Sequence, residues 1–304
     1  MSFLVADNLV KKYGPTAALD GFSLAVASGS IFALVGPDGA GKTTLIRILC
    51  HLLDADSGTV NIDNRDISRH YEQIKPILGY MPQQFSLYPD LSVEENLTFY
   101  AGLYGLTGEA YRRKRDQLYE FSNLQPFAKR RAGALSGGMK QKLALSCALI
   151  HEPRLLILDE PTTGVDPLSR RQFWEILLQL KREGVTMLVS TPYMDEVARC
   201  DRAAFIFQGR KLAEDTPSGL AEAFVGHIYH VDREPTSALL EQVNRLSGLS
   251  AARFGAGMHL YLAADDDLGR HIRPLSDLGI TLDRIMPIKA DLEDRFIQLM
   301  ETGA

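Results

Sequence analysis

A glycine-rich segment near the start of the sequence carries the residues needed to bind phosphate. It follows a short apolar run, Ser30 to Val35, and precedes an apolar helical pattern. In that context the spacing G-x-x-x-x-G-K-[ST] predicts a loop whose backbone N–H groups surround phosphate oxygens at a helix N-terminus. Lys42 would reach the β- and γ-phosphates, and the Thr43 hydroxyl would ligate Mg²⁺. The predicted nucleotide-binding residues are Gly36, Pro37, Asp38, Gly39, Ala40, Gly41, Lys42, Thr43 and Thr44.

The alternative to a phosphate loop is a glycine-rich turn without a ligand. The joint occurrence of strand, lysine and threonine in the right order disfavours that alternative. The sequence therefore predicts nucleotide binding.

Two acidic residues follow a second apolar run, in the segment RLLILDEP from Arg154 to Pro161. The run predicts a buried central strand with Asp159 and Glu160 at its carboxyl end, the edge where open α/β sheets bind ligands. Asp159 would hold the Mg²⁺ shell through water, and Glu160 would orient and polarise a water in line with the γ-phosphate. Two acidic residues opening a loop would be the simpler interpretation if no phosphate loop preceded them.

The segment LSGGMKQKLALSCALIHEP, Leu135 to Pro153, predicts a helix with a polar, glycine-rich start. Ser136 is an N-cap candidate, and the two glycines after it permit close backbone approach. Taken alone, this segment is also compatible with a capped core helix.

The order of these three segments resembles the ATP-binding cassette (ABC) ATPases, over about Phe3 to Leu220. LSGGMKQK is the most specific element of the resemblance, because other phosphate-loop enzymes lack it. The resemblance implies ATP and Mg²⁺ as cofactors and a second ABC ATPase subunit as a partner. It also implies that the signature residues contact the ATP of that neighbouring subunit; these are Ser136, Gly137 and Gly138.

Three further positions match family residues. Tyr13 matches an aromatic residue that stacks on adenine, a contact worth ~1–3 kcal/mol, although ordinary strand packing also explains it. Gln83, beside Gln84, matches a glutamine that touches Mg²⁺ and the attacking water. Asp166 matches an aspartate that bridges the two subunits, although a turn residue before Pro167 is a competing interpretation.

Two positions depart from the family pattern. Asp38 replaces the usual asparagine of the phosphate loop, and both residues suit such turns. Pro192 stands where the family has its switch histidine, in STPYMDEVARC instead of the usual STHYMDEAE. Proline has no side-chain donor and no backbone N–H, so it cannot hydrogen-bond the γ-phosphate. No histidine lies between His151 and His227 to take over the role.

Loss of one charge-stabilising donor at such a site costs about 10²–10³ in rate. We therefore expect the chain to bind ATP and to hydrolyse it poorly at its own site. An intact signature segment could still complete a competent site on a different partner, so an asymmetric heterodimer is preferred over a homodimer in which Glu160 supports slow turnover. Proline or serine at this position resembles the first cassette of some tandem ABC drug-export ATPases.

The elements that must position these residues belong to a mixed α/β protein. The 304 residues, 45% hydrophobic and 23% charged, are ordinary for a soluble globular chain. A net charge of −5 gives no reason to expect nucleic acid as a partner. No apolar run approaches the roughly 18 residues needed to span a bilayer. The three cysteines lack metal-ligand spacing and are expected in the core; they are Cys50, Cys147 and Cys200.

We expect an ABC ATP-binding domain over residues 1–222, with a helical subdomain at about 90–150, followed by an accessory domain over 223–304. The pattern after Leu220 predicts the order βαββαβ, which favours a small ferredoxin-like α+β domain whose role the sequence leaves open. The ending ADLEDRFIQLM resembles the SLEDVF tail of exporter ATPases that serve ABC-2 type permeases.

The resemblance implies an ATPase subunit that powers export through a separately encoded ABC-2 type permease. It would lie in the cytoplasm, peripheral to the inner face of the cell membrane, with the helical subdomain docked on the permease. Phe85, Leu87 and Tyr88 are candidates for that docking groove, and core packing explains them nearly as well. The alternatives are a soluble, non-transport ABC ATPase and a regulatory ATP sensor.

Overall fold

The chain divides after Pro217 into two compact units, and the computed structural model describes residues 1–302. The sequence placed the boundary after Glu222. Residues on both sides of the observed boundary form one short helix, α8 (Pro217–Glu222), which the sequence assigned entirely to the first domain.

A six-stranded sheet forms the centre of the first unit. Its strands are β3 (Ile31–Val35), β6 (Leu78–Met81), β7 (Leu155–Asp159), β8 (Thr186–Thr191), β9 (Arg202–Phe207) and β10 (Arg210–Asp215). Their order is β10-β9-β3-β8-β7-β6, and all neighbouring pairs are parallel except β9 and β10. β3, β7 and β8 are buried along their whole length, as expected for parallel strands covered on both faces.

The N-terminal part of the same unit forms an antiparallel sheet. Its strands are β1 (Ser2–Tyr13), β2 (Thr16–Ala27), β4 (Ser57–Ile62) and β5 (Arg65–Asp66), in the order β2-β1-β4-β5. Alternate residues of β2 are buried between Phe22 and Val26, which is the pattern of a strand with one face on the core.

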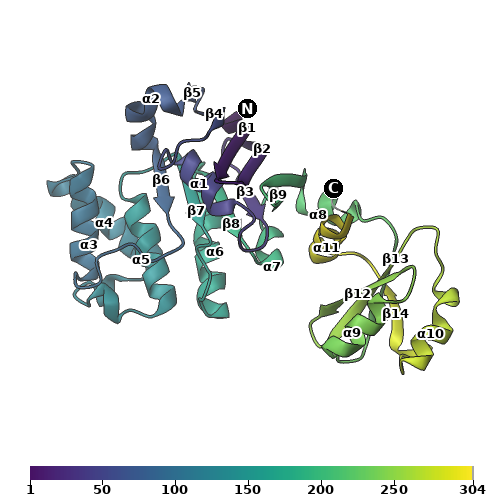
Figure 1. Cartoon of the computed structure of the whole chain (residues 1–304). Helices are drawn as coiled ribbons and strands as arrows, with labels where there is room; N and C mark the ends of the chain where they lie inside the picture. The colour runs from purple at the N-terminus through teal and green to yellow at the C-terminus, as the bar shows by residue number, and fades with distance from the viewer. Residues whose placement is uncertain (303–304) are drawn as a thin grey trace. The chain divides into compact units, whose positions relative to one another are not determined.

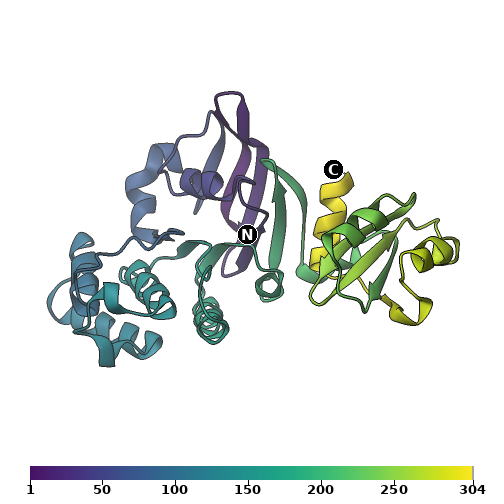
Figure 2. The same cartoon turned by 60° about the horizontal axis from the view of Figure 1, so that its bottom comes forward.

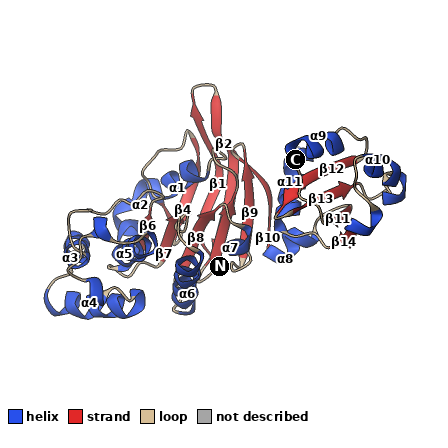
Figure 3. Cartoon of the chain, turned by 90° about the horizontal axis from the view of Figure 1, so that it is seen from below, coloured by secondary structure: helices blue, strands red, loops and turns tan. Residues whose placement is uncertain are grey.

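Helices fill the space around both sheets. Those of the core are α1 (Lys42–Leu49), α2 (Ile67–Ile74), α6 (Pro167–Arg182) and α7 (Met194–Val197). Leu45 and Ile46 of α1 share one continuous hydrophobic core with Leu4 of β1 and Leu34 of β3. Trp174 of α6 is the largest fully buried side chain, and Figure 3 shows α6 beside the red strands of the central sheet. This packing holds α1 and β3, the two elements that flank the glycine-rich segment.

Three helices form a separate group at one end of the first unit (Figure 1). They are α3 (Val93–Leu103), α4 (Gly108–Ser122) and α5 (Gly137–Leu149), which contact one another. Ser92 caps α3 in a capping box with Glu95. The buried Asn96 side chain bonds the backbone of Tyr88, Leu91 and Ser92, and so fixes the segment that enters the helical group.

The second unit is the small α+β fold that the sequence predicted. Its elements after α8 are β11 (His227–Val231), α9 (Ser237–Asn244), β12 (Leu249–Phe254), β13 (Gly257–Leu262), α10 (Ile272–Asp277), β14 (Ile285–Ile288) and α11 (Leu292–Thr302). The strands form one antiparallel sheet in the order β12-β13-β11-β14, that is, 2-3-1-4 within the unit. The βαββαβ order is therefore observed, with α11 added after it.

The two faces of this sheet have different partners. Met258 and Leu260 of β13 face a core that includes residues of α9 and α10. The alternate residues His259 and Tyr261 bond the fully buried Asp294 of α11, at 2.7 and 2.9 Å. Figure 2 shows α11 in yellow beside the green strands. This network holds the C-terminal helix on the second face of the sheet.

His151, just after α5, joins the helical group to β6. Its Nε2 lies 3.0 Å from the Leu78 carbonyl oxygen, and its ring stacks on Tyr104 at 3.8 Å and 3°. Its Nδ1 is buried and, within residues 1–302, has no hydrogen-bond partner. Burial lowers the pKa of His151, and nearby Lys114 acts in the same direction. The folded protein therefore favours the neutral ring.

We predict that this histidine makes the first unit sensitive to acid. Because the folded-state pKa lies below that of the unfolded chain, the unfolded state takes up a proton first as the pH falls through about 6.5. The free energy of unfolding should then decrease between pH 7.5 and 5.5, and decrease less in a His151→Gln variant. Urea denaturation at the two pH values measures the difference. An equal loss of stability in both proteins would contradict the prediction.

Candidate active site

Three strand ends bring the predicted site residues together. β8 pairs with β3 on one side and with β7 on the other, so that Thr191 lies beside Val35 and Ser190 beside Asp159. Parallel strands point their carboxyl ends to the same edge of a sheet, where α/β proteins bind ligands. The residues that leave this edge are therefore neighbours; they are Gly36, Glu160 and Pro192.

The glycine-rich loop runs from the end of β3 into α1. Gly39 has φ = 78° and Gly41 has φ = 108°, conformations that residues with a Cβ rarely adopt. Gly41 is the N-cap of α1, which begins at Lys42. Thr43 and Thr44 occupy the first turn and are partly buried, while Asp38 is exposed in the turn of the loop. The loop therefore presents a helix N-terminus, the geometry that favours an anion.

The Lys42 side chain reaches back into this loop and across to β7. Its Nζ donates to the carbonyl oxygens of Gly36 at 2.8 Å and Pro37 at 3.1 Å. It also lies 3.0 Å from Glu160 Oε1, and both charged side chains are almost fully buried. The ion pair joins the phosphate loop to the predicted catalytic carboxylate.

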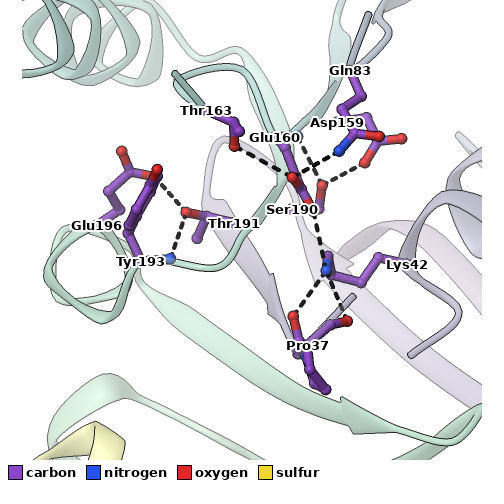
Figure 4. A network of polar contacts seen from close by, with 11 residues as sticks. Pro37, Lys42, Gln83, Asp159, Glu160, Thr163, Ser190, Thr191, Tyr193 and Glu196 are labelled. Atoms are coloured by element: carbon purple, nitrogen blue, oxygen red, sulfur yellow. Dashed lines mark hydrogen bonds and ion pairs between the residues drawn. The ribbon is translucent and has the colours of Figure 1, made fainter. Parts of the chain in front are cut away.

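Glu160 adopts an uncommon backbone conformation that aims its side chain into the site (Figure 4). Its φ of 48° lies in the left-handed region, which costs a residue with a Cβ about 1–3 kcal/mol. The second carboxylate oxygen accepts from Gln83 Nε2 at 2.9 Å and from the Thr163 hydroxyl at 3.3 Å. Gln83, and not its neighbour Gln84, is therefore the glutamine that faces Glu160.

Asp159 presents two different oxygens. Ser190 Oγ donates to Oδ1 at 2.6 Å, whereas Oδ2 is buried and has no hydrogen-bond partner among the described residues. Burial raises the pKa of Asp159, and the Ser190 hydrogen bond and the nearby Thr43 hydroxyl oppose the rise. An ionised carboxylate with one unpartnered buried oxygen is suited to a cation or to water bound to one.

The segment around Pro192 is fixed by a buried carboxylate. Glu196, 1% exposed, accepts from Thr191 Oγ1 at 2.5 Å and from Thr162 Oγ1 at 2.6 Å. Thr191 Oγ1 also accepts the backbone N–H of Tyr193, and the Arg170 guanidinium lies over the Tyr193 ring. The Thr191 hydroxyl is therefore already engaged beside the exposed Pro192.

Two residues expected to serve a neighbouring subunit cap helices in this chain. Ser136 caps α5 by accepting the Met139 N–H at 3.4 Å, and Asp166 caps α6 by accepting the Ser169 N–H at 2.9 Å. Hydrogen bonds from the Ser169 hydroxyl and from its backbone N–H lower the pKa of Asp166. Gly138 is needed for close packing, because a Cβ there would lie 2.4 Å from the Ser169 side chain. Asp166 therefore has a structural role before Pro167 within its own chain. This role is compatible with a contact between Asp166 and a second subunit.

The remaining predicted residues are placed as follows. Tyr13 ends β1 with 51% of its surface exposed, so its ring is not a core residue. Thr43, Gln83 and Asp159 offer a hydroxyl, an amide and a carboxylate for a metal. Within residues 1–302 no cluster of three or more His, Cys, Asp or Glu side chains could hold a metal ion. All three cysteines are free and buried, as expected.

The sequence analysis missed four side chains that order this site. Ser190, Thr163, Thr162 and Glu196 all make buried or half-buried hydrogen bonds at the sheet edge. Ser190 follows three apolar residues in its strand, and Glu196 is an acidic residue in a short, partly buried helix. A polar residue inside an otherwise apolar run was the available signal.

Comparison with protein families and curated proteins gives consistent matches. The ABC transporter family model matches residues 19–163. The chain is 40% identical over 281 residues to the probable multidrug ABC transporter ATP-binding protein YbhF of Escherichia coli, and spans about half (48%) of that relative's length. It is 34% identical to the Nod factor export ATP-binding protein I of Burkholderia orbicola, covering 96% of this chain and 95% of the relative.

Solved structures of similar fold are ATP-binding cassettes. An ATP-binding subunit of an ABC transporter superposes with a TM-score of 0.66 at 30% identity, covering 73% of this chain and 92% of that one. A dimeric cassette in a post-hydrolysis state, bound to ADP and phosphate, gives a TM-score of 0.64 at 26% identity, covering 70% of this chain and 98% of that one.

We predict that Glu160→Gln strengthens ATP binding. The Glu160 charge holds Lys42 and would repel phosphate oxygens, so its removal leaves the lysine available and lowers the Kd for ATP about three- to tenfold, equivalent to about 1 kcal/mol. Fluorescent ATP titration measures the change. The control is Glu175→Gln, which removes the same negative charge from an exposed position on α6. Weaker binding by Glu160→Gln than by this control would show that the ion pair does not compete with phosphate.

Proposed function

Because the chain belongs to the ATP-binding proteins of ABC transporters, we propose that it binds and hydrolyses ATP to energise export through a separate membrane permease. Family membership rests on relatives such as the Nod factor export protein, matched over 95% of its length, and it confirms the resemblance seen in the sequence. The observation that carries the proposal is the meeting of the phosphate loop, Gln83, Asp159 and Glu160 at one sheet edge.

The site supports ATP as the nucleotide and Mg²⁺ as its metal. The unpartnered buried Oδ2 of Asp159, in a donor set of hydroxyl, amide and carboxylate, matches the oxygen ligands that Mg²⁺ prefers. Thr43, Gln83 and Asp159 would hold the ion, with the last acting through water. When bound, it would neutralise charge that develops on the phosphate oxygens.

The chain's own residues provide the remaining chemistry. Lys42 would exchange Glu160 for phosphate oxygens, because its Nζ now pairs with that carboxylate. Glu160, released from the lysine, would accept a hydrogen bond from the attacking water and polarise it. Gln83 contacts the same carboxylate and would orient both groups. Tyr13, half-exposed at the end of β1, would stack on adenine.

Hydrolysis at this site is proposed to be weak. Pro192 follows Thr191 at the sheet edge, where a donor to the γ-phosphate would stand, and the neighbouring Thr191 hydroxyl is already engaged by Glu196. We infer that the chain works best in a heterodimer, in which Ser136, Gly138 and Asp166 complete the ATP site of a partner cassette that keeps its own donor. In a homodimer, Glu160 alone would support slow turnover.

We predict that Pro192→His raises the rate of ATP hydrolysis by the purified chain about 10²-fold without a comparable change in ATP affinity, because it restores one charge-stabilising donor. Steady-state phosphate release and ATP titration measure the two quantities. Glu160→Gln is the control for contaminating activity. If the wild-type rate is already high and the histidine adds nothing, Pro192 is tolerated and the heterodimer proposal fails.

A cavity in the first unit supports docking of a permease. It measures about 190 Å³ and lies between β6 of the core and the helices α3 and α5; among its lining residues are Tyr71, Leu87, Tyr100, Tyr104 and His151. Tyr88, Phe99 and Leu103 expose large apolar surfaces on or near α3. Within residues 1–302 no helix has the length and apolar character required to cross a bilayer. We propose that a cytoplasmic segment of an ABC-2 type permease covers this face and holds the chain at the inner side of the membrane.

We predict that Leu103→Asp weakens membrane association without changing ATP hydrolysis by the purified chain. Leu103 is 63% exposed, so a charge there should leave folding and the activity of the purified chain unchanged. It would enter an apolar interface, and the fraction of the chain that sediments with native membranes should fall about tenfold or more. Leu282→Asp, at a similarly exposed leucine of the second unit, is the control. Equal sedimentation of both variants would exclude this docking face.

A further inference from the structure

Ser190 connects the two acidic residues of the site through one hydroxyl group. It lies near the end of β8 and is fully buried. Its Oγ donates to Asp159 Oδ1 at 2.6 Å and accepts the backbone N–H of Glu160 at 2.9 Å (Figure 4). A hydroxyl has one donor and two acceptor positions, so both bonds can form at the same time.

The first of these bonds decides which Asp159 oxygen remains available. With Oδ1 bonded to Ser190, Oδ2 is the oxygen that lacks a hydrogen-bond partner in the described part of the chain. A carboxylate held by one oxygen cannot rotate freely about its Cβ–Cγ bond. The bond therefore orients the oxygen that would face the Mg²⁺ shell.

The second bond holds the Glu160 backbone where its conformation is unfavourable. Glu160 has φ = 48°, and its N–H also reaches the Ser190 carbonyl oxygen at 3.2 Å. The direction of the Glu160 side chain follows from this backbone geometry, and that side chain meets Lys42 and Gln83. Ser190 thus acts on both carboxylates from one atom.

The surroundings of Ser190 favour a role beyond packing. It follows Met187, Leu188 and Val189, all fully buried, in a strand where an apolar side chain would avoid the cost of burying a hydroxyl. Its hydroxyl hydrogen bonds to no group outside the two acidic residues among residues 1–302.

We propose that Ser190 is a positioning residue that sets the Asp159 carboxylate and the Glu160 backbone for Mg²⁺-dependent ATP hydrolysis. This inference rests on the function proposed above and deepens it. Ser190 would contact neither substrate nor metal; it would act through Asp159 and Glu160. Removal of a residue that hydrogen-bonds a metal ligand typically lowers metal affinity or activity 10- to 100-fold.

Ser190→Ala in the full chain tests the proposal. The expected results are a kcat reduced about 10-fold or more, an unchanged KM for ATP, and at least a several-fold rise in the Mg²⁺ concentration that gives half-maximal activity. Titration of Mg²⁺ against binding of a fluorescent ATP analogue should show the same rise without relying on turnover. ATP binding without Mg²⁺ should match that of wild type. The matched control is Ser122→Ala, which removes an equally buried hydroxyl bonded to a helix carbonyl in α4.

A structural role alone would lower the melting temperature and leave the Mg²⁺ midpoint and the kcat of the folded protein at wild-type values, which would overturn the proposal. In an Asp159→Asn background, Ser190→Ala should shift the Mg²⁺ midpoint less than it does in wild type; an equal shift would also overturn it. If Ser190→Ala does not fold, Ser190→Cys, of similar size and a weaker donor, must shift the midpoint in the same direction.

A second set of measurements distinguishes failure of the Ser190 proposal from failure of the proposed function. Turnover is compared in wild type, Pro192→His and Glu160→Gln before Ser190 is changed. Equal rates in all three would refute the ATPase assignment itself. Turnover that Glu160→Gln abolishes, together with a Ser190→Ala protein that retains the wild-type Mg²⁺ midpoint, would refute the role of Ser190 alone.

Discussion

Parallel pairing of β3, β8 and β7 is the constraint on which the site depends. The register places Val35 beside Thr191 and Asp159 beside Ser190, so that three chain segments far apart in sequence leave the sheet together. A shift of one residue would turn each strand's side chains to the opposite face and separate these groups. Because all three strands are buried along their whole length, the hydrophobic core enforces the register, and chemistry at the edge is stabilised by packing beneath it.

Buried charge is the second organising feature. Lys42, Glu160 and Glu196 are almost fully buried, a placement that is costly unless each charge has partners. Lys42 and Glu160 neutralise one another, and Glu196 accepts one threonine hydroxyl from the loop after β7 and one from the end of β8. These contacts link the phosphate loop, the loop after β7 and the segment after β8. A displacement of one loop would therefore shift the others. Coupling between nucleotide state and partner contacts requires such a connection.

The sequence predicted most of the fold and the main chemical groups, because motifs report local chain geometry. The glycine spacing before Lys42, the acidic pair after an apolar run and the N-cap candidate Ser136 each describe one continuous segment, and the structure places each as predicted. Contacts between segments were harder to foresee. Nothing local marks Ser190 as the partner of Asp159, or Glu196 as the anchor of Thr162. These depend on strand register and on how loops close over it. The two compact units divide after Pro217, at the start of α8, and the predicted boundary after Glu222 lies at the end of the same helix.

The helix caps formed by Ser136 and Asp166 have a consequence for how such a site would evolve. Both side chains satisfy backbone N–H groups within their own chain, as N-cap residues do. Selection for folding alone would retain them, whether or not a neighbouring subunit uses them. Pro192 is exposed, and its side chain has no polar atom with which to cap a helix. A substitution at position 192 would therefore disturb folding less than a substitution at either cap. The chemistry of position 192 can change without loss of the two helix starts.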